Sequence, residues 1–338
     1  MEAQPHKNTL HKFSNVLLSQ SLDFLELKNT IDEMKEWLWE VSGLDWEDEA
    51  ISSNIQLEKG YAIGPKWAGM CLEDMLRTRI FTMGIYEAVL EKKQAQPNTP
   101  VHLFYIGTGP FATLILPLLS KFSPSELQLE LLEVNKTSIE SVQKILQSLD
   151  AWDYVKEIHH ADALQFEFSE KNKEIDLVVV ECLQHALMRE PQVAIAYHVL
   201  PQLQKNIVMI PEDISLKIAV LDYKKKMSAS NNSYAQVLGT IFSLNKKSIL
   251  QKCGEKNGEL LEFPEVFTPF EEIENLKGKS LAVTTEICVY KKHKLEIDQS
   301  GLTVPMILTQ FKEKADYKGI RTRYVLDESP YIWSELVS

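Results

Sequence analysis

The sequence predicts an α/β fold in which a Rossmann-like parallel sheet lies between a helical N-terminal region and a β-rich C-terminal domain. In residues 96–212, continuous apolar runs alternate with helical patterns, which is typical of parallel strands covered on both faces. Residues 1–95 carry apolar side chains mostly at helical spacing. Residues 213–338 contain β-branched, strand-like runs separated by turn residues. We therefore expect three regions with these boundaries.

The first region is expected to be mostly helical. Apolar residues recur at helix-like spacing over residues 25–41 and again over residues 67–93. Residues 94–100 contain two prolines among polar residues, so they are expected to form a linker.

The second region supplies the strands and helices of the sheet. The expected strands are residues 101–106, 127–133, 155–160 and 175–181, and the expected helices are residues 111–121, 138–149 and 191–203. Ligands of such folds bind at the carboxyl ends of the strands. Gly107, Glu133, Asp162 and Glu181 all fall at these ends. The sequence therefore predicts one site formed by these residues.

Composition narrows the classes of function. The net charge of −12 argues against extended nucleic-acid binding, which needs a basic face. The sequence contains no apolar run near the ~18 residues that a membrane span needs, and its N-terminus lacks the pattern of a signal peptide. The four cysteines have no metal-site spacing and fit free thiols, and His159-His160 lack a third ligand. We expect a cytoplasmic protein without metal, nucleic acid or membrane partners.

A glycine turn indicates a nucleotide-type cofactor. The first strand of the sheet ends in Gly107-Thr108-Gly109, and a helical pattern follows. Such a turn gathers backbone N–H groups and the positive end of a helix dipole at one point. The turn and Ala112 together meet the G-x-G-x-x-G/A pattern, and Glu133 falls where an acid binds a ribose. The turn alone is compatible with NAD, with S-adenosylmethionine, or with a nucleotide-free α/β fold.

The rest of the second region resembles the class I S-adenosylmethionine-dependent methyltransferases. The similarity lies in G-T-G-P, in E-V-N after the second strand, in H-H-A-D-A after the third, and in the strand I-D-L-V-V-V-E. It implies that the glycine turn packs against the methionine moiety and that Glu133 binds the ribose hydroxyls. It also implies that Asp162, next to Ala163, meets the adenine amine. The implied cofactor is S-adenosyl-L-methionine, with S-adenosyl-L-homocysteine as product.

Two more segments resemble the protein arginine methyltransferase family, and the likeness covers about residues 60–213. Glu181 and Glu190 lie nine residues apart after the fourth strand, and a helix and the strand I-V-M-I-P-E-D follow. Upstream, D-M-L-R-T-R-I-F matches the family's acid-x-x-Arg-Thr-x-x-aromatic helix. The resemblance implies that Arg77 binds the methionine carboxylate of the cofactor and that a homodimer forms.

The chemistry of a guanidino acceptor explains the glutamate pair. A guanidinium is planar, charged and a poor nucleophile, and two carboxylates can bind its opposite edges. Binding of this kind localises charge away from one terminal nitrogen and aligns that nitrogen with the methyl group. A carboxylate that accepts the departing proton also acts as a general base. We expect Glu181 and Glu190 to be the catalytic residues.

The sequence leaves several alternatives open. Three family motifs that shape the acceptor pocket are missing: the Thr-His-Trp loop, the paired tyrosines, and the Met-Gly-Tyr that Leu183-Gln184-His185 replaces. A small guanidino or amino compound is therefore an alternative to a peptide, as is another N or O nucleophile or a non-catalytic module that binds the cofactor. Arg77 could instead pair with Asp74 or Glu73 on its own helix. Glu190 could serve only as a helix N-terminal acid.

Overall fold

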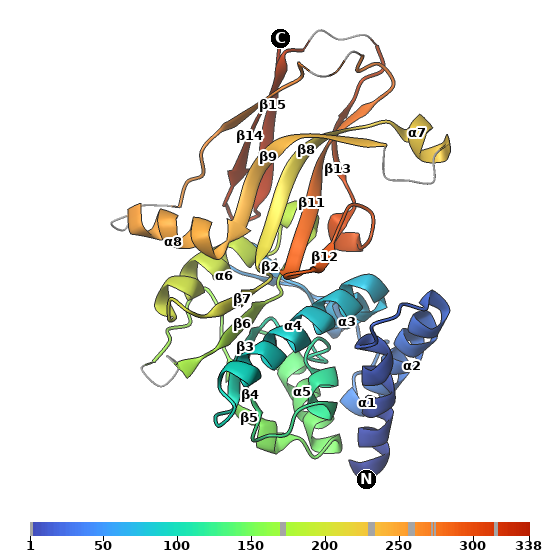
Figure 1. The fold of residues 1–338 in the computed structure, drawn as a ribbon, viewed down its shortest axis with the longest axis vertical. Coiled ribbons are helices and arrows are strands. Elements are labelled where there is room, and N and C mark those ends of the chain that lie inside the picture. The colour runs from blue at the N-terminus through green and yellow to red at the C-terminus, as the bar shows by residue number, and fades with distance from the viewer. Residues whose placement is uncertain are drawn as a thin grey trace.

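A computed structural model describes residues 3–169, 174–228, 234–255, 261–271, 273, 275–313 and 317–338 of the chain. Its parallel sheet has the strand order β5-β4-β3-β6-β7 and occupies the lower half of Figure 1. The strands are β3 (Val101–Ile106), β4 (Leu127–Glu133), β5 (Val155–His160), β6 (Leu177–Val180) and β7 (Val208–Ile210). The helices between them are η3 (Leu116–Ser120), α5 (Lys136–Ser148), η4 (Trp152–Tyr154), η6 (His185–Leu187), α6 (Gln192–Val199) and η7 (Leu200–Gln202). The predicted α/β fold class is confirmed.

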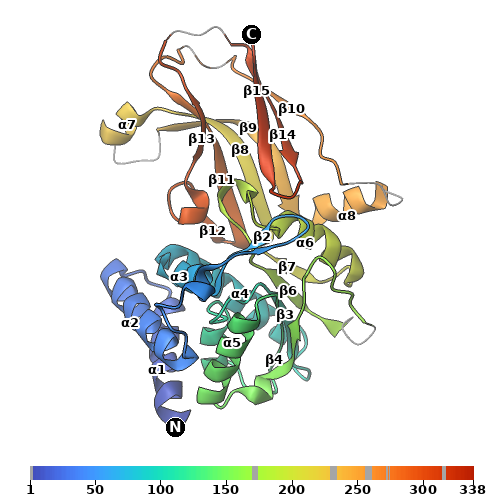
Figure 2. The same ribbon diagram turned by 180° about the vertical axis from the view of Figure 1, so that it is seen from behind.

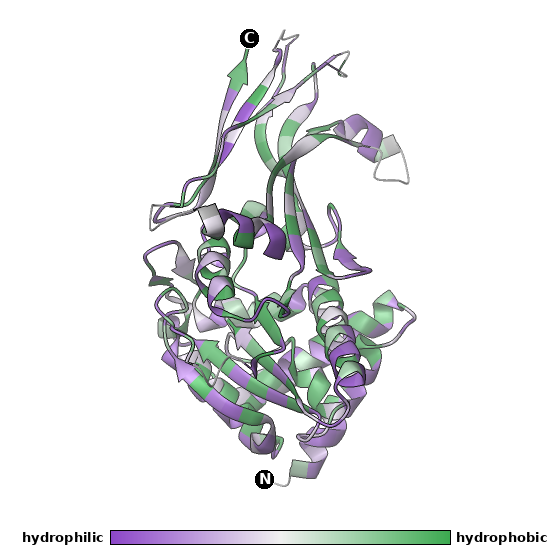
Figure 3. Ribbon diagram, turned by 60° about the vertical axis from the view of Figure 1, so that its left-hand side comes forward, coloured by the Kyte–Doolittle hydropathy of each residue, from purple (hydrophilic) through white to green (hydrophobic). Residues whose placement is uncertain are grey.

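The central strands form because their residues are apolar on both faces. Every residue of β3 and of β6 is buried, which suits strands covered by helices on either side. Figure 3 shows green, hydrophobic stretches along the ribbons of the parallel sheet in the lower part of the molecule. Asn135 caps α5 by accepting hydrogen bonds from the backbone N–H groups of Thr137 (2.9 Å) and Ser138 (3.3 Å).

The helix expected over residues 111–121 forms only in its second half. The chain instead makes turns after the glycines and then the 3₁₀ helix η3. Ala112 adopts a left-handed φ of 47°, which interrupts a right-handed helix. The apolar residues here are buried on all sides, so helical spacing was a poor guide to the backbone. The glycine turn therefore offers N–H groups without the dipole of an α-helix behind them.

The N-terminal region is mostly helical, as expected, but contains one small hairpin. Its elements are α1 (Ala3–Leu17), α2 (Phe24–Ser42), η1 (Glu49–Ser52), β1 (Ile55–Gln56), β2 (Tyr61–Ala62), α3 (Pro65–Met70), η2 (Cys71–Glu73) and α4 (Met75–Ala95). The helix expected over residues 67–93 is divided because Asp74 leaves the helical conformation and caps α4. Figure 2 shows the β1–β2 hairpin between the parallel sheet and the C-terminal strands.

The C-terminal part is β-rich, as expected. It comprises β8 (Asp213–Leu221), α7 (Tyr223–Ser228), β9 (Ala235–Asn245), α8 (Lys246–Glu255), β10 (Val266–Pro269), β11 (Ser280–Tyr290), β12 (His293–Leu295), η8 (Gly301–Thr303), β13 (Met306–Gln310), β14 (Gly319–Val325) and β15 (Tyr331–Val337). One antiparallel sheet has the order β12-β11-β8-β9 with β13 on β11, and a second has the order β10-β14-β15.

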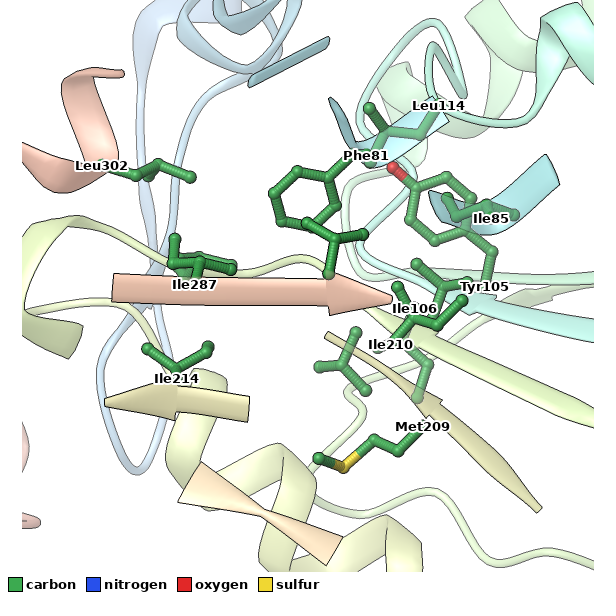
Figure 4. Packing of buried hydrophobic residues seen from close by; sticks show 14 of the residues in the cluster. Phe81, Ile85, Tyr105, Ile106, Leu114, Met209, Ile210, Ile214, Ile287 and Leu302 are labelled. Atoms are coloured by element: carbon green, nitrogen blue, oxygen red, sulfur yellow. The ribbon is translucent and has the colours of Figure 1, made fainter. Parts of the chain in front are cut away.

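The two halves share one hydrophobic core. Phe81 and Ile85 of α4 belong to the same buried cluster as Ile287 of β11 and Ile214 of β8. Figure 4 shows Phe81 on the side of β11 that carries Ile287, and Ile85 beside Tyr105 of β3. At the edge of this contact, Glu87 pairs with His293 (2.5 Å) and Glu91 with Lys291 of the β11–β12 turn (2.5 Å). The C-terminal strands are therefore packed against the helix that carries Arg77.

Among the described helices, none combines the length and the apolar character that a membrane span requires.

Candidate functional site

One cavity lies at the carboxyl ends of β3, β4, β5 and β6, under α3 and the β1–β2 hairpin. Every residue that the sequence singled out for the site lines it: Arg77, Gly107, Thr108, Gly109, Glu133, Asp162, Ala163, Glu181 and Glu190. The structure therefore brings together three motifs that are far apart in the sequence. The remaining wall is mainly apolar, as in most small-molecule sites.

The glycine turn lies against the end of β6. Gly107 has a φ of 79°, which residues with a Cβ rarely adopt. A Cβ at this position would lie 2.3 Å from Cys182 Sγ and 3.0 Å from the Glu181 carbonyl oxygen. Only glycine allows this close approach, and the approach places the turn beside the glutamate loop.

Glu133 is buried at the end of β4 and holds the glycine turn. Its carboxylate accepts hydrogen bonds from the Gly109 N–H (2.9 Å) and the Asn135 N–H (2.8 Å). Burial raises the pKa of Glu133, and these donors counteract part of the rise. A carboxylate has about four acceptor positions, so Glu133 can still accept hydrogen bonds from the hydroxyl groups of a ligand.

Asp162 and Ala163 follow β5 on the next wall of the cavity. Asp162 accepts a hydrogen bond from the Leu164 N–H (2.9 Å) through Oδ1, which orients its side chain within the turn. Both residues line the cavity beside Ser138 of α5. From this position the Asp162 carboxylate can accept a hydrogen bond from a donor group of a ligand.

Arg77 pairs with Glu181 rather than with an acid on its own helix. The Arg77 guanidinium donates a hydrogen bond to Glu181 Oε1, and the two side chains are only 12% and 8% exposed. Burial alone would lower the pKa of Arg77, but the combined effects of Glu181, Cys71 and Glu190 outweigh burial and raise it. Burial raises the pKa of Glu181, and Arg77 opposes that rise. Each group therefore stabilises the charged form of the other.

The two acids that directly precede α4, Glu73 and Asp74, have other partners. Asp74 accepts a hydrogen bond from the Arg77 backbone N–H (3.1 Å) and caps α4. Its other oxygen accepts from Ser300 Oγ (2.6 Å) and the Gly301 N–H (2.7 Å) of the C-terminal domain. Glu73 pairs with Lys35. Asp74 thus joins the start of α4 to the C-terminal domain.

Gln192, which the sequence did not single out, holds Glu181 in place. Its side chain accepts from the Cys182 N–H (2.9 Å) and donates to the Val180 carbonyl (2.9 Å). These are the backbone groups on either side of Glu181, so a single buried amide orients that residue. The only signal in the sequence was a polar residue at the start of an otherwise apolar helix.

Glu190 is the buried acid of the site without a partner. It is 8% exposed, and within the described part of the chain no hydrogen bond or ion pair reaches its carboxylate. Burial and repulsion by Glu181 raise the pKa of Glu190 to about 7, against the opposing effect of Arg77. Pro191 is the N-cap of α6 and makes no side-chain cap bond, and no cap bond comes from Glu190 either. A role limited to helix capping does not account for this carboxylate.

Comparison with known proteins identifies the fold. No protein-family model and no curated protein matches the sequence. The structure is similar to PRMT1 in the Trypanosoma brucei enzyme–prozyme heterotetrameric complex with AdoHcy, with a TM-score of 0.52 and 11% identity over 79% of this chain and 96% of that one. It is also similar to PRMT6, with a TM-score of 0.51 and 11% identity over 79% of this chain and 97% of that one.

The fold resembles that of the PRMT structures. This likeness covers 79% of this chain and nearly the whole of both neighbours. It confirms the class of fold that the motifs predicted. At 11% identity the likeness concerns the fold alone, and the chemistry depends on the residues of the cavity.

Proposed function

We propose that this protein is an S-adenosylmethionine-dependent N-methyltransferase that acts on a guanidino nitrogen of arginine, either free or in a peptide. The observation that carries the proposal is the convergence of Arg77, Glu181 and Glu190 on the cavity that the glycine turn and Glu133 enclose. One structural neighbour is a complex with AdoHcy, which supports the choice of cofactor.

The cavity residues fit this cofactor. In this proposal Arg77 binds its methionine carboxylate, Glu133 its ribose hydroxyls and Asp162 its adenine amine, and their position along the cavity wall supports these roles. A cationic sulfonium is also favoured next to two buried glutamates. When bound, S-adenosylmethionine supplies an electrophilic methyl group.

The two glutamates are suited to a cationic acceptor. Arg77 occupies Oε1 of Glu181, so Oε2 remains available, and both oxygens of Glu190 are available. One edge of a guanidinium can bind to each residue, which orients a terminal nitrogen toward the cofactor. Glu190 takes up the proton that the methylated nitrogen releases. With a pKa near 7 it is a stronger base than an ordinary carboxylate.

One observation favours a second acceptor class. Because Arg77 already neutralises Glu181, Glu190 is the glutamate of the pair without an ionic partner. A single carboxylate suits a compact ammonium group as well as a guanidinium. A small primary or secondary amine is therefore the alternative substrate class.

Labelled methyl transfer tests the proposal. The wild-type protein is incubated with methyl-labelled S-adenosylmethionine and free arginine, an arginine-containing peptide, a lysine-containing peptide or a polyamine. Transfer to either arginine acceptor supports the guanidino assignment. Transfer to the amines alone supports the alternative. Binding of S-adenosylhomocysteine without transfer to any acceptor, including a cell extract, indicates a non-catalytic module.

Two variants test the glutamate pair. Glu181→Gln and Glu190→Gln should abolish transfer and leave S-adenosylhomocysteine binding intact, while Glu58→Gln, an exposed residue of the β1–β2 hairpin, should leave both unchanged. Full activity in both site variants would rule out the guanidinium clamp. The heterotetrameric assembly of one neighbour is consistent with self-association, and we propose a homodimer, which light scattering can test.

A further inference from the structure

The loop that carries Glu190 has an unfavourable backbone conformation. Ala186, Leu187 and Arg189 have φ values of 56°, 54° and 65°, in the left-handed region that residues with a Cβ seldom occupy. Such conformations persist only where surrounding groups hold them. They also cluster at functional sites, so the contacts that hold this loop bear on the position of Glu190.

Two side chains of the C-terminal domain hold the loop. The Ala186 N–H donates a hydrogen bond to Thr285 Oγ1 on β11 (3.0 Å), and the Tyr324 hydroxyl on β14 donates to the Leu187 carbonyl (2.7 Å). The two bonds therefore hold consecutive residues, both left-handed. They come from different sheets of the C-terminal domain.

Both side chains are held firmly by their own surroundings. Thr285 and Tyr324 are buried. The Tyr324 ring stacks on Phe242 at 4.5 Å between centroids and meets Phe263 edge-on at 5.5 Å. Rigid partners of this kind define the position of a hydrogen-bonded loop more closely than exposed ones do.

Backbone bonds complete the support. The Arg189 N–H donates to the Pro330 carbonyl (2.9 Å), and the Arg189 carbonyl accepts from the Tyr61 N–H of the β1–β2 hairpin (3.0 Å). The carboxylate of Glu190, in contrast, has no partner of its own in the described structure. Its location in the cavity therefore depends on how the loop backbone is held.

We propose that Thr285 and Tyr324 are positioning residues for Glu190, which they place by holding Ala186 and Leu187 in left-handed conformations. The inference rests on the proposed function in so far as Glu190 acts in methyl transfer. Neither residue lines the cavity, so they act through the loop and not on the substrate. The C-terminal strands thereby take part in placing Glu190, although none of their described residues lines the cavity.

The test removes one hydroxyl at a time. Thr285→Val and Tyr324→Phe delete the two bonds and keep the shape of each side chain, and Thr285→Ser retains the acceptor. Thr284→Val and Tyr154→Phe are matched controls, because those hydroxyls donate to backbone carbonyls outside the loop, of Lys217 (3.3 Å) and of Leu119 and Phe122 (3.0 and 2.7 Å). Hydrogen exchange of residues 183–189, S-adenosylhomocysteine affinity and kcat are measured for each variant.

We expect loop amides to exchange at least about tenfold faster in Thr285→Val and Tyr324→Phe, and kcat to fall between about tenfold and a hundredfold. S-adenosylhomocysteine affinity should stay within about twofold, since the cofactor residues are untouched. Thr285→Ser should restore wild-type exchange and turnover, and both controls should match the wild type.

The outcomes separate the inference from the proposed function. The positioning role would be overturned if hydrogen exchange of the loop and kcat were both unchanged in Thr285→Val and Tyr324→Phe. It would also be overturned if the matched controls lost as much activity as these two variants. A wild-type protein that transfers no methyl group overturns the proposed function instead. In that case loop exchange in the variants still decides whether Thr285 and Tyr324 hold the loop.

Discussion

Replacing Glu190 by glutamine should stabilise the protein at alkaline pH and inactivate it. The pKa of Glu190 is raised from 4.5 to about 7, so the folded protein binds its proton more tightly than the unfolded chain does. The stability that comes from this proton is fully present below about pH 4.5 and is lost as the pH rises through about 7. Glutamine stays neutral, so the variant does not lose this contribution to its stability over the same pH range.

The magnitude follows from the shift. A rise from 4.5 to about 7 corresponds to about 3 kcal/mol of differential stability, because one pKa unit is worth about 1.4 kcal/mol. The advantage of Glu190→Gln over the wild type should therefore grow by about 3 kcal/mol between pH 4.5 and pH 8.5. Methyl transfer should fall by about a hundredfold or more, because the proton acceptor is lost.

Urea unfolding followed by tryptophan fluorescence at pH 4.5, 6.0, 7.0 and 8.5 measures the difference. Glu47→Gln, which removes an exposed carboxylate after α2, is the control and should show a difference that does not change with pH. If the difference between Glu190→Gln and the wild type is also independent of pH, Glu190 does not titrate as a buried, partnerless acid. Its role as a base with a raised pKa would then be refuted.

Other substitutions test other walls of the cavity. Gly107→Ala should destabilise the protein by about 2–3 kcal/mol and abolish S-adenosylhomocysteine binding. Its new Cβ would lie 2.3 Å from a cysteine sulfur, whereas Gly278→Ala, at a φ of 78° with nothing within 4 Å, should show only the backbone strain. Arg77→Lys should weaken S-adenosylhomocysteine binding about tenfold by calorimetry, since lysine lacks the planar fork that binds carboxylates. Gln192→Leu should lower kcat and cost about 1–3 kcal/mol in urea unfolding, because the peptide groups beside Glu181 lose their partners.

The pH dependence of turnover has a definite sign. Glu190 must be deprotonated to accept a proton, so kcat should rise as the pH increases through about 7. Stability and activity therefore change in opposite directions over one pH range. This opposition is characteristic of sites where function is retained at the expense of stability.

The acids at the strand ends were predictable because of the geometry of a parallel sheet. Once residues 101–106, 127–133 and 155–160 were assigned as parallel strands, their carboxyl ends had to meet at one edge. Glu133 and Asp162 follow directly from that reasoning. The local pattern of apolar residues was enough, and no long-range contact had to be known.

The support of the glutamate loop could not be predicted from the sequence. Ala186 and Thr285 are 99 residues apart, and Leu187 and Tyr324 are 137 apart. No periodicity connects a loop to a distant strand, and each bond depends on tertiary packing. The partner of Arg77 was ambiguous for the same reason, since Glu181 is 104 residues away while Asp74 is three.

The most direct test of the central claim is calorimetric titration of the wild-type protein with S-adenosylhomocysteine and, separately, with NAD. We expect one S-adenosylhomocysteine site per chain, which Gly107→Ala should abolish. Titration with NAD should give no heat of binding. Binding of NAD, or the absence of S-adenosylhomocysteine binding, would contradict the assignment of the glycine turn, Arg77 and the glutamate pair to a methyltransferase site.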